Sequence, residues 1–530
     1  MKDKIISKYL LCAIIFAIIS TAYWSAFAVN AYNSYHDYSD VGVCSYDMYF
    51  HVNYPSIVHG LQYLIFCNHV SPDSILLFLP AFAAFPSAVT LLVLQAIVVS
   101  FTGLAVFMIS RKLLSNERTA FLLFLAFLLN PGVIALLVFD FHLEVLIPLF
   151  MLLTFYFFVE KTKAPFFVSA LLLLGTIEVV APVALMLGVG FIFYAVHAAQ
   201  GKKIDREYLV MAAALIIMAA VAAGLYAGVY STLTHAYASG NYPGLPIILK
   251  DIKFFSGNSS YFASLFTNGR ILIYYIPLYA TCFALAIVFF SFGIGAIFEF
   301  FILLLLSSPW LANVLLFQNS NFVNLFNQYF AFALGGTMIA TLMSLIMFKE
   351  KTERFYRNWR FRDFVKPYVD YTIVISLVVL LLVYLFIILS TNVESLRELL
   401  LLRVGSPQEH VYDQQLSSLI SAIPANASVM APYFVMPHLM DREKLEIIQG
   451  YGQNYSIIPQ NALANRWNEY DAWFAPDYVV EDSDQYTSNT PLTGFGFGNT
   501  VNDSILAMYG GVYHVYGRNG NATLLVREAG

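Results

Sequence analysis

Residues 88–110 read AVTLLVLQAIVVSFTGLAVFMIS, a run without a charged side chain that is followed directly by Arg111 and Lys112. An α-helix needs about 20 apolar residues to cross about 30 Å of hydrocarbon. Because the hydrocarbon offers no water to backbone groups, such a run satisfies its own hydrogen bonds as a helix. The run therefore predicts a membrane-spanning helix.

Similar runs recur along the 530 residues, of which 59% are hydrophobic and 12% are charged. A soluble protein usually carries roughly 25% charged residues, and its core could not hold this much apolar surface. The sequence predicts a multi-pass α-helical membrane protein with about eleven spans. They lie near 9–29, 88–110, 119–138, 143–159, 165–177, 179–197, 208–230, 271–291, 294–308, 327–348 and 369–391.

Two parts of this assignment stay open. The stretches 165–197 and 271–308 each fit one long helix or two short ones. The first run, 9–29, follows a basic start like a signal peptide, but it is long and has no clean small-residue cleavage site. We interpret it as a retained first helix.

Lys and Arg residues orient the predicted spans. They gather near the N-terminus and in the segments 111–118, 161–163, 202–206 and 349–366, whereas the first loop, 30–87, contains neither residue type. Short loops rich in Lys and Arg stay cytoplasmic. We therefore expect a cytoplasmic N-terminus, a basic cytoplasmic loop at 349–368, and external loops at 30–87 and 231–270. Glycosylation sequons at Asn258, Asn426, Asn454, Asn502 and Asn521 fall on the same external side.

The chain divides by composition into a membrane domain, 1–393, and a polar tail, 394–530. Short apolar runs at 427–431, 478–480 and 523–526, separated by Pro and Gly, predict strands. We expect an extracytoplasmic α/β domain.

Two of the four cysteines, Cys44 and Cys67, share the first loop. A disulfide is possible there if the loop is external, and two buried free thiols fit the sequence equally well.

Costly polar groups in or beside apolar spans mark candidate functional sites. All of them fall on the predicted outer face. They are Asp37, Asp40, Asp47, His51 and His69 in the first loop, Asp140, His142 and Glu144 between the third and fourth spans, Glu178 between the fifth and sixth, and Asn327, Gln328 and Tyr329 at the start of the tenth.

Each group also has a purely structural interpretation. On a helix, Asp140 and Glu144 would be like charges one turn apart, with His142 as a donor between them. Alternatively, Asp140 and His142 cap helix ends. Glu178 has no basic neighbour in sequence, so it needs a partner from another helix or a short turn that reaches water.

The loop histidine His69 precedes Ser71-Pro72, where we expect a helix with Pro at its first position. The sequence contains no P-loop, no dinucleotide-binding glycine motif, no His-Glu-x-x-His and no nucleic-acid signature.

Four motifs, in order, resemble those of the DUF2079 family of predicted polytopic membrane proteins. They are Asp40-Val-Gly-Val, His69-Val-Ser-Pro, Phe85-Pro-Ser followed by Leu91-Leu-Val-Leu-Gln95, and Phe139-Asp-Phe-His142. Glu178 is similar to the Glu of the family's Lys-Glu-Asp segment, and Gln328-Tyr329 resembles its His-Tyr pair. The chain departs from the family at Ile177 and Val179, which flank Glu178, at Leu143 in place of Pro, and at Ser45 in place of a second Asp.

That family is similar to the C-type (GT-C) glycosyltransferases. The resemblance implies transfer of a sugar from a polyprenyl-phosphate carrier to an external glycan, lipid or protein. It implies catalytic roles for Asp40, Asp140, His142 and Glu178, with Asp40 as the base, and substrate-binding roles for His69, Asp47, Gln328 and Tyr329.

The charge of the leaving phosphate would be balanced either by a divalent cation, Mg or Mn, held by Asp140, His142 and Glu178, or by donors such as His69 and Tyr329. Lys250, Lys253 and Arg270 would fold over the site. The alternative functions are a transporter or lipid flippase that uses the same acids, and a non-catalytic membrane protein.

Overall fold

The computed structural model describes two large parts of the chain. They comprise residues 7–35, 39–53, 64–67, 69–138, 140–199 and 203–238, then 407–432, 434–442, 445–447, 476–482, 512–519 and 522–528, with single residues and short runs between 331 and 382. The spans predicted at 271–291 and 294–308 lie outside the described residues, and those at 327–348 and 369–391 are only partly described.

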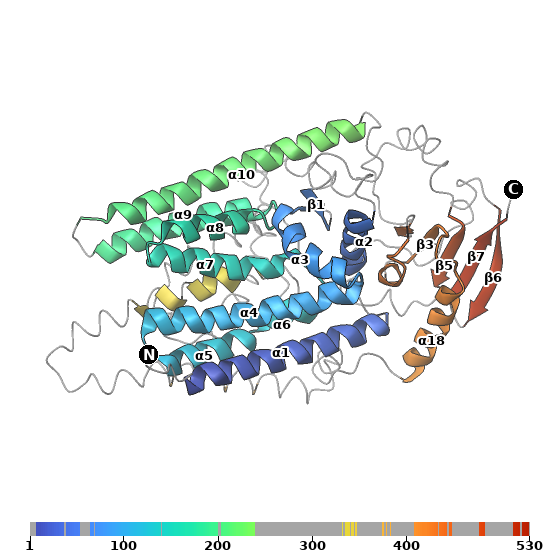
Figure 1. The fold of residues 1–530 in the computed structure, drawn as a ribbon, viewed down its shortest axis with the longest axis horizontal. Helices are drawn as coiled ribbons and strands as arrows, with labels where there is room; N and C mark the ends of the chain where they lie inside the picture. Colours follow the sequence, from blue (N-terminus) through green and yellow to red (C-terminus); the bar gives the residue numbers. More distant parts are fainter. Residues whose placement is uncertain are drawn as a thin grey trace, which may run out of the picture.

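Most helices run side by side along the long axis of the molecule (Figure 1). They are α1 (Lys8–Asn33), α4 (Ala88–Leu114), α5 (Glu117–Leu128), α6 (Pro131–Val138), α7 (Leu146–Val159), α8 (Lys163–Leu174), α9 (Val180–Ala199) and α10 (Arg206–Ala238). Within the described residues, α1, α4 and the Arg206–Val229 part of α10 are long and apolar enough to span a membrane, and the bent pair α5–α6 passes the same test only when it is counted as one span. The chain is therefore a helical membrane protein, while the total of eleven spans stays a prediction.

Two helix breaks follow from local sequence. The span predicted at 119–138 is bent by 53°. Asn130 accepts a hydrogen bond from the Gly132 N–H at its Oδ1 (2.8 Å), and Pro131, which has no N–H, opens α6. In the 165–197 stretch, the two-helix alternative is correct, because α8 ends at Leu174 and α9 begins at Val180.

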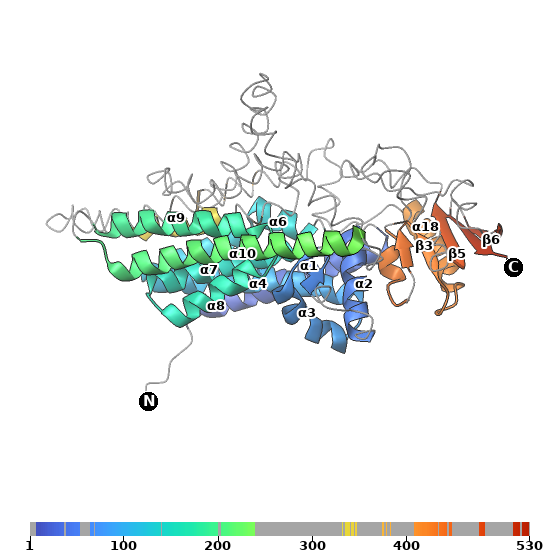
Figure 2. The same cartoon turned by 90° about the horizontal axis from the view of Figure 1, so that it is seen from above.

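The ion-paired Lys and Arg side chains of the bundle lie at one of its ends. At one end, Arg111 pairs with Glu117 (2.7 Å), Lys163 pairs with Glu207 (3.0 Å) and Lys161 pairs with Asp205. The opposite end carries the first-loop elements and the tail, as both views show (Figures 1 and 2). This separation matches the charge pattern of the sequence, whereas the assignment of the ends to cytoplasm and exterior stays a prediction.

The first loop contains two helices and a hairpin: α2 (Ser39–Asn53), β1 (Ile65–Phe66), β2 (His69–Val70) and α3 (Pro72–Ala84). Helix α3 starts with Pro72 at its first turn, as expected. The Ser71 hydroxyl does not cap α3, because it donates to the Thr176 carbonyl instead.

The described tail combines a helix with a five-stranded sheet. Its elements are α18 (Pro407–Ser421), β3 (Val429–Ala431), the 3₁₀ turn η5 (Met436–His438), β4 (Leu445–Ile447), β5 (Tyr478–Asp482), β6 (Tyr513–Asn519) and β7 (Ala522–Arg527). The strand order is β4-β3-β5-β7-β6, parallel among β4, β3 and β5 and antiparallel at β7 and β6. The three runs expected as strands form β3, β5 and β7, and the boundary at 393/394 lies outside the described residues.

Helix α2 lies between the bundle and the tail (Figures 1 and 2). On the tail side, Gly42 leaves room for η5: an added Cβ would lie 3.2 Å from atoms of both Met436 and Pro437. The Leu445 N–H donates to the Tyr46 hydroxyl (3.2 Å), and Tyr35 and Ser417 share a 2.8 Å hydrogen bond. The tail thus packs on the end of α1 and on one face of α2.

Candidate functional site

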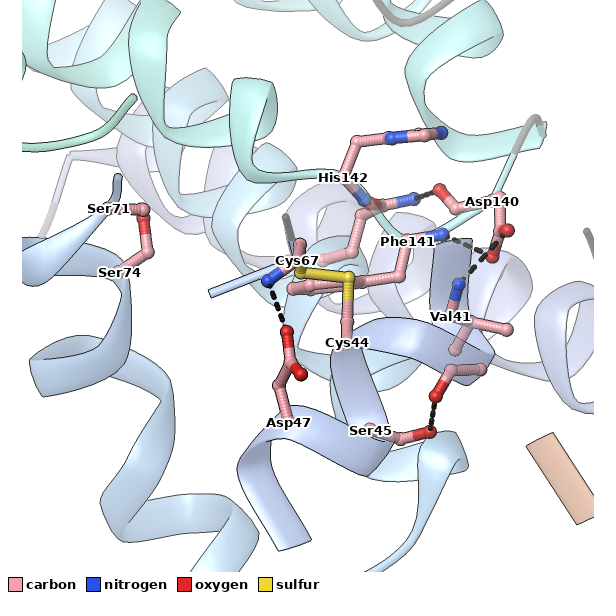
Figure 3. Close-up of a disulfide and its surroundings, with 12 residues drawn as sticks. Val41, Cys44, Ser45, Asp47, Cys67, Ser71, Ser74, Asp140, Phe141 and His142 are labelled. Carbon is pink, nitrogen blue, oxygen red and sulfur yellow. Dashed lines mark hydrogen bonds between the residues drawn. A yellow bond between two sulfur atoms is a disulfide. The ribbon is translucent and has the colours of Figure 1, made fainter. Parts of the chain in front are cut away.

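A disulfide joins α2 to the hairpin (Figure 3). Cys44 and Cys67 are bonded, which settles the alternative that the sequence left open. Cys67 has a φ of 53°, the left-handed conformation that tight hairpin turns require. Its N–H donates to the Asp47 Oδ2 (2.9 Å), so α2 holds the turn by a covalent bond and a hydrogen bond. Across the hairpin, His69 pairs with Phe66, which fixes where the His69 side chain emerges.

His69 and Glu178 form a pair between the first loop and the turn that joins α8 to α9. The His69 Nδ1 lies 2.8 Å from the Glu178 Oε1, and the Val70 N–H donates to Oε2 (3.1 Å). The Glu178 side chain is 6% exposed, and the His69 side chain is 26% exposed. The partner that the buried carboxyl group needs is thus supplied by the first loop.

Asp140 binds the start of α2. Its Oδ2 accepts a hydrogen bond from the Val41 N–H (3.1 Å), and its Oδ1 accepts from the N–H of Phe141 (2.6 Å; Figure 3). The N–H groups in the first turn of a helix lack partners within it, and a negative charge is favourable there. Asp140 therefore does cap a helix, but that helix belongs to the first loop and includes Asp40.

The segment after Asp140 is not the α-helix on which Asp140 and Glu144 would lie one turn apart. Residues 140–142 form no helix, and Leu143–Val145 is a 3₁₀ turn, η2. The reason is Gln95 in α4. Its Nε2 donates to the carbonyls of Leu136 (2.8 Å) and Asp140 (2.7 Å), and its Oε1 accepts from the His142 N–H (2.8 Å). These hydrogen bonds occupy backbone carbonyl and N–H groups that would pair with each other in a continuous helix.

The N-terminal turn of α3 also contacts the α8–α9 turn. The Asp73 N–H donates to the Gly175 carbonyl (3.2 Å), and the Ser74 hydroxyl donates to the Thr176 carbonyl (3.3 Å). Asp73 lies in the first loop, where partial burial raises the pKa of its carboxyl group to about 6. Neither Asp73 nor Gln95 was among the site residues expected from the sequence. The signal of Gln95 was an amide within an otherwise apolar run, and that of Asp73 was a carboxyl group in the first turn of the helix expected at Pro72.

The structure describes the other expected site residues to different extents. Asp40 lies in the first turn of α2, and the structure describes its backbone alone. His142 is buried, and the His51 Nδ1 lies 2.7 Å from the Asp47 carbonyl. Asp37, Lys250, Lys253, Arg270, Asn327, Gln328 and Tyr329 lie outside the described residues.

A metal site is not formed by the described residues. Asp140, His142 and Glu178, the expected ligands of Mg or Mn, do not come together as a group of three metal-binding side chains in the described part of the chain. Both carboxylate oxygens of Asp140 and both of Glu178 accept hydrogen bonds or face a histidine. In the described part of the chain these oxygens thus bind protein groups and do not gather around one cation position.

Comparison with solved structures gives similarities at low sequence identity. ArnT from Cupriavidus metallidurans bound to undecaprenyl phosphate is 12% identical, with a TM-score of 0.48 over 98% of this chain and 98% of that chain. The apo form of the Archaeoglobus fulgidus oligosaccharyltransferase is 11% identical, with a TM-score of 0.45 over 97% of this chain and 74% of that chain. Similarity at this level does not transfer a function.

No curated protein matches the chain. The family model described as "Predicted membrane protein (DUF2079)" matches residues 41–491, a range that contains Asp140, Glu178 and most of the first loop. The chain therefore belongs to the DUF2079 family of predicted membrane proteins.

Proposed function

We propose that this protein is a membrane glycosyltransferase that moves a sugar from a polyprenyl-phosphate carrier to an extracytoplasmic acceptor. One observation carries the proposal. At the end of the bundle opposite its paired Lys and Arg residues, acidic side chains from two helix turns bind the first loop: Asp140 through a backbone N–H and Glu178 through His69. Such groups are costly beside a membrane and are kept there for function. The DUF2079 motifs support the same reaction indirectly, because that family resembles the C-type glycosyltransferases.

In this proposal Asp40 is the base. Inversion at the anomeric carbon requires that the acceptor hydroxyl lose its proton as it attacks, and a carboxylate within hydrogen-bond reach takes it. Asp140 holds the N–H of Val41, the residue next to Asp40. Its contribution is to fix the backbone that carries the base, so we assign Asp140 a positioning role.

The leaving phosphate needs hydrogen-bond donors or positive charge. His69 is the donor that we assign. In its protonated form it gives the Nδ1–H to Glu178, which orients the ring and balances its charge, and it keeps the Nε2–H for the phosphate; about a quarter of the side chain is exposed. Asp47 holds the hairpin that carries His69. Gln328 and Tyr329 complete the proposed substrate contacts. No step is assigned to a metal.

The proposal places the N-terminus in the cytoplasm and the site, the first loop and the tail outside. A lipid-linked sugar would then approach from the outer half of the membrane. The tail, which packs on α2, would offer the nearest polar surface to an acceptor.

The substitution Asp40→Asn tests the proposal. We expect it to lower sugar transfer from a polyprenyl-phosphate donor by at least about 100-fold in liposomes, because an amide cannot accept the proton. Expression and membrane insertion should persist. The control is Asp205→Asn at the basic end of the bundle, which should keep its activity. Full activity in Asp40→Asn would remove Asp40 from the mechanism.

Cells that lack the protein separate the transferase from the transporter or flippase. Mass spectrometry of surface glycans and lipids should show a missing sugar if the proposal is correct. An unaltered glycan profile together with altered solute uptake would support transport instead.

A further inference from the structure

Beside the His69–Glu178 pair, the start of α3 and the turn after α8 are joined by hydrogen bonds. The last carbonyls of a helix and its first N–H groups lack partners within the helix. Here the carbonyls of Gly175 and Thr176, just beyond α8, accept from Asp73, Ser71 and Ser74 at the start of α3. On the opposite side, the Tyr226 hydroxyl of α10 donates to the Leu174 carbonyl. The α8–α9 turn is thus held from both the first loop and α10.

Glycine at position 175 makes this contact possible. A Cβ added to Gly175 would lie 2.0 Å from the Asp73 Oδ2 and 2.4 Å from its Cγ. The backbone φ of Gly175 is −83°, which any residue adopts, so the requirement is space and not conformation. The Asp73 carboxyl group therefore lies directly against the backbone of the turn.

The contact between residues 71–74 and 175–176 is close in sequence to both members of the His69–Glu178 pair. His69 is two residues before Ser71, and Glu178 is two residues after Thr176. Consequently, the register between residues 71–74 and 175–176 determines whether the His69 ring reaches the Glu178 carboxylate at 2.8 Å.

We propose that Asp73 is a positioning residue. Its carboxyl group packs against Gly175 and thereby sets the register between the first loop and the α8–α9 turn, which aligns His69 with Glu178. Its effect on sugar transfer rests on the proposed function, whereas its effect on the register does not. An amide has nearly the shape of a carboxyl group but no charge, so Asp73→Asn keeps the contact with Gly175 and separates the shape of the side chain from its charge.

A double-mutant cycle in the full-length protein in nanodiscs tests the contact. Hydrogen exchange is measured in peptides that cover 69–74 and 175–180. We expect Gly175→Ala to speed exchange in both peptides by about tenfold or more, because the methyl group displaces Asp73. In the Asp73→Ala background, which lacks the clashing atoms, the same substitution should change exchange less than about threefold. Gly224→Ala, whose Cβ meets no atom within 4 Å, is the control.

Two single variants keep the test decisive if Gly175→Ala does not fold. Asp73→Ala should speed exchange in both peptides and shift the pH profile of kcat/KM, whereas Asp73→Asn should leave both close to wild type. An equal effect of Gly175→Ala in both backgrounds, or wild-type exchange in Asp73→Ala, would overturn the proposal. If the wild type transfers no sugar, the exchange data still decide on Asp73. If Asp40→Asn abolishes transfer but the exchange results fail, this inference alone is wrong.

Discussion

Gln95 shows how one buried side chain determines the shape of a turn. Its amide satisfies two carbonyls and one N–H of the segment 136–142, in the place where α6 ends and Asp140 begins to bind α2. A buried backbone group without a partner costs about 1–3 kcal/mol. The amide therefore stabilises the backbone that presents both Asp140 and His142.

Replacing Gln95 by Leu should destabilise the protein by about 3 kcal/mol, because three buried backbone groups lose their partner at once. Thermal unfolding in detergent measures the change. The matched control is Ser100→Ala in the same helix, where the hydroxyl is buried and makes no hydrogen bond in the described part of the chain. Equal unfolding temperatures for wild type and Gln95→Leu would contradict this role.

Local sequence indicated the Ser71-Pro72 helix start and the polar character of Glu178, since both depend on neighbouring residues. It did not identify the partner of Glu178, because His69 lies 109 residues away. The target of Asp140 was likewise a backbone N–H in a distant helix. Backbone groups carry no residue-specific signal, so a single sequence shows that Asp140 needs a partner without showing which one.

At the scale of elements, the first loop is ordered by the contacts between α2 and the hairpin. Cys67 has a left-handed backbone conformation that non-glycine residues seldom adopt. The disulfide and the Asp47 carboxylate both hold Cys67 there. The charge pattern predicted an external loop, but it left the state of the two thiols open, because spacing alone does not report the distance between them.

Reduction of the disulfide should lower the stability of the first loop by about 3 kcal/mol, since a bond across 23 residues removes much of the freedom of the unfolded loop. The unfolding temperature of the wild type should fall when a reductant is added, and that of Cys44→Ala/Cys67→Ala should not respond. Cys12→Ser, which removes an exposed free thiol, should behave as wild type. A reductant effect that persists in the double variant would rule out this origin.

Hydropathy predicted apolar segments better than the breaks within them. The stretch 119–138 was predicted as one span, whereas the structure bends it at Asn130-Pro131, and the division of 165–197 at the turn that carries Glu178 was one of two alternatives. The paired helices of the bundle were not predictable, because apolar faces of similar composition do not specify which neighbour they contact.

At the scale of the whole molecule, the tail and the membrane bundle meet at His438. Its ring lies between Tyr32 and Tyr35 at the end of α1, with centroid distances of 4.1 Å to each. Burial lowers the pKa of His438 to about 4, from an ordinary value of 6.5. The docked tail therefore favours the neutral imidazole.

Docking of the tail should weaken in acid. Because the undocked His438 binds a proton more readily, the stabilisation is complete above pH 6.5 and is lost as the pH falls towards 4, by up to about 3 kcal/mol. Hydrogen exchange of residues 434–442, corrected for the intrinsic effect of pH, should speed up across this range. His438→Phe keeps a stacking ring without a proton site and should remove the response. The same acid response in that variant would assign it to another group.

The bonds of Asp140 to Val41 and of Glu178 to His69 span 99 and 109 residues. During synthesis, the first loop leaves the ribosome well before either acid has been made, and contacts of such separation form late. The loop can acquire its disulfide early, yet α2 gains its cap only when the α6–α7 connection is in place. His69 meets Glu178 only after α8 has entered the membrane. The order of insertion thus delays the His69–Glu178 pair until more than 100 residues after His69 have been made. A chain arrested before residue 178 would display a closed hairpin whose His69 lacks its carboxylate partner.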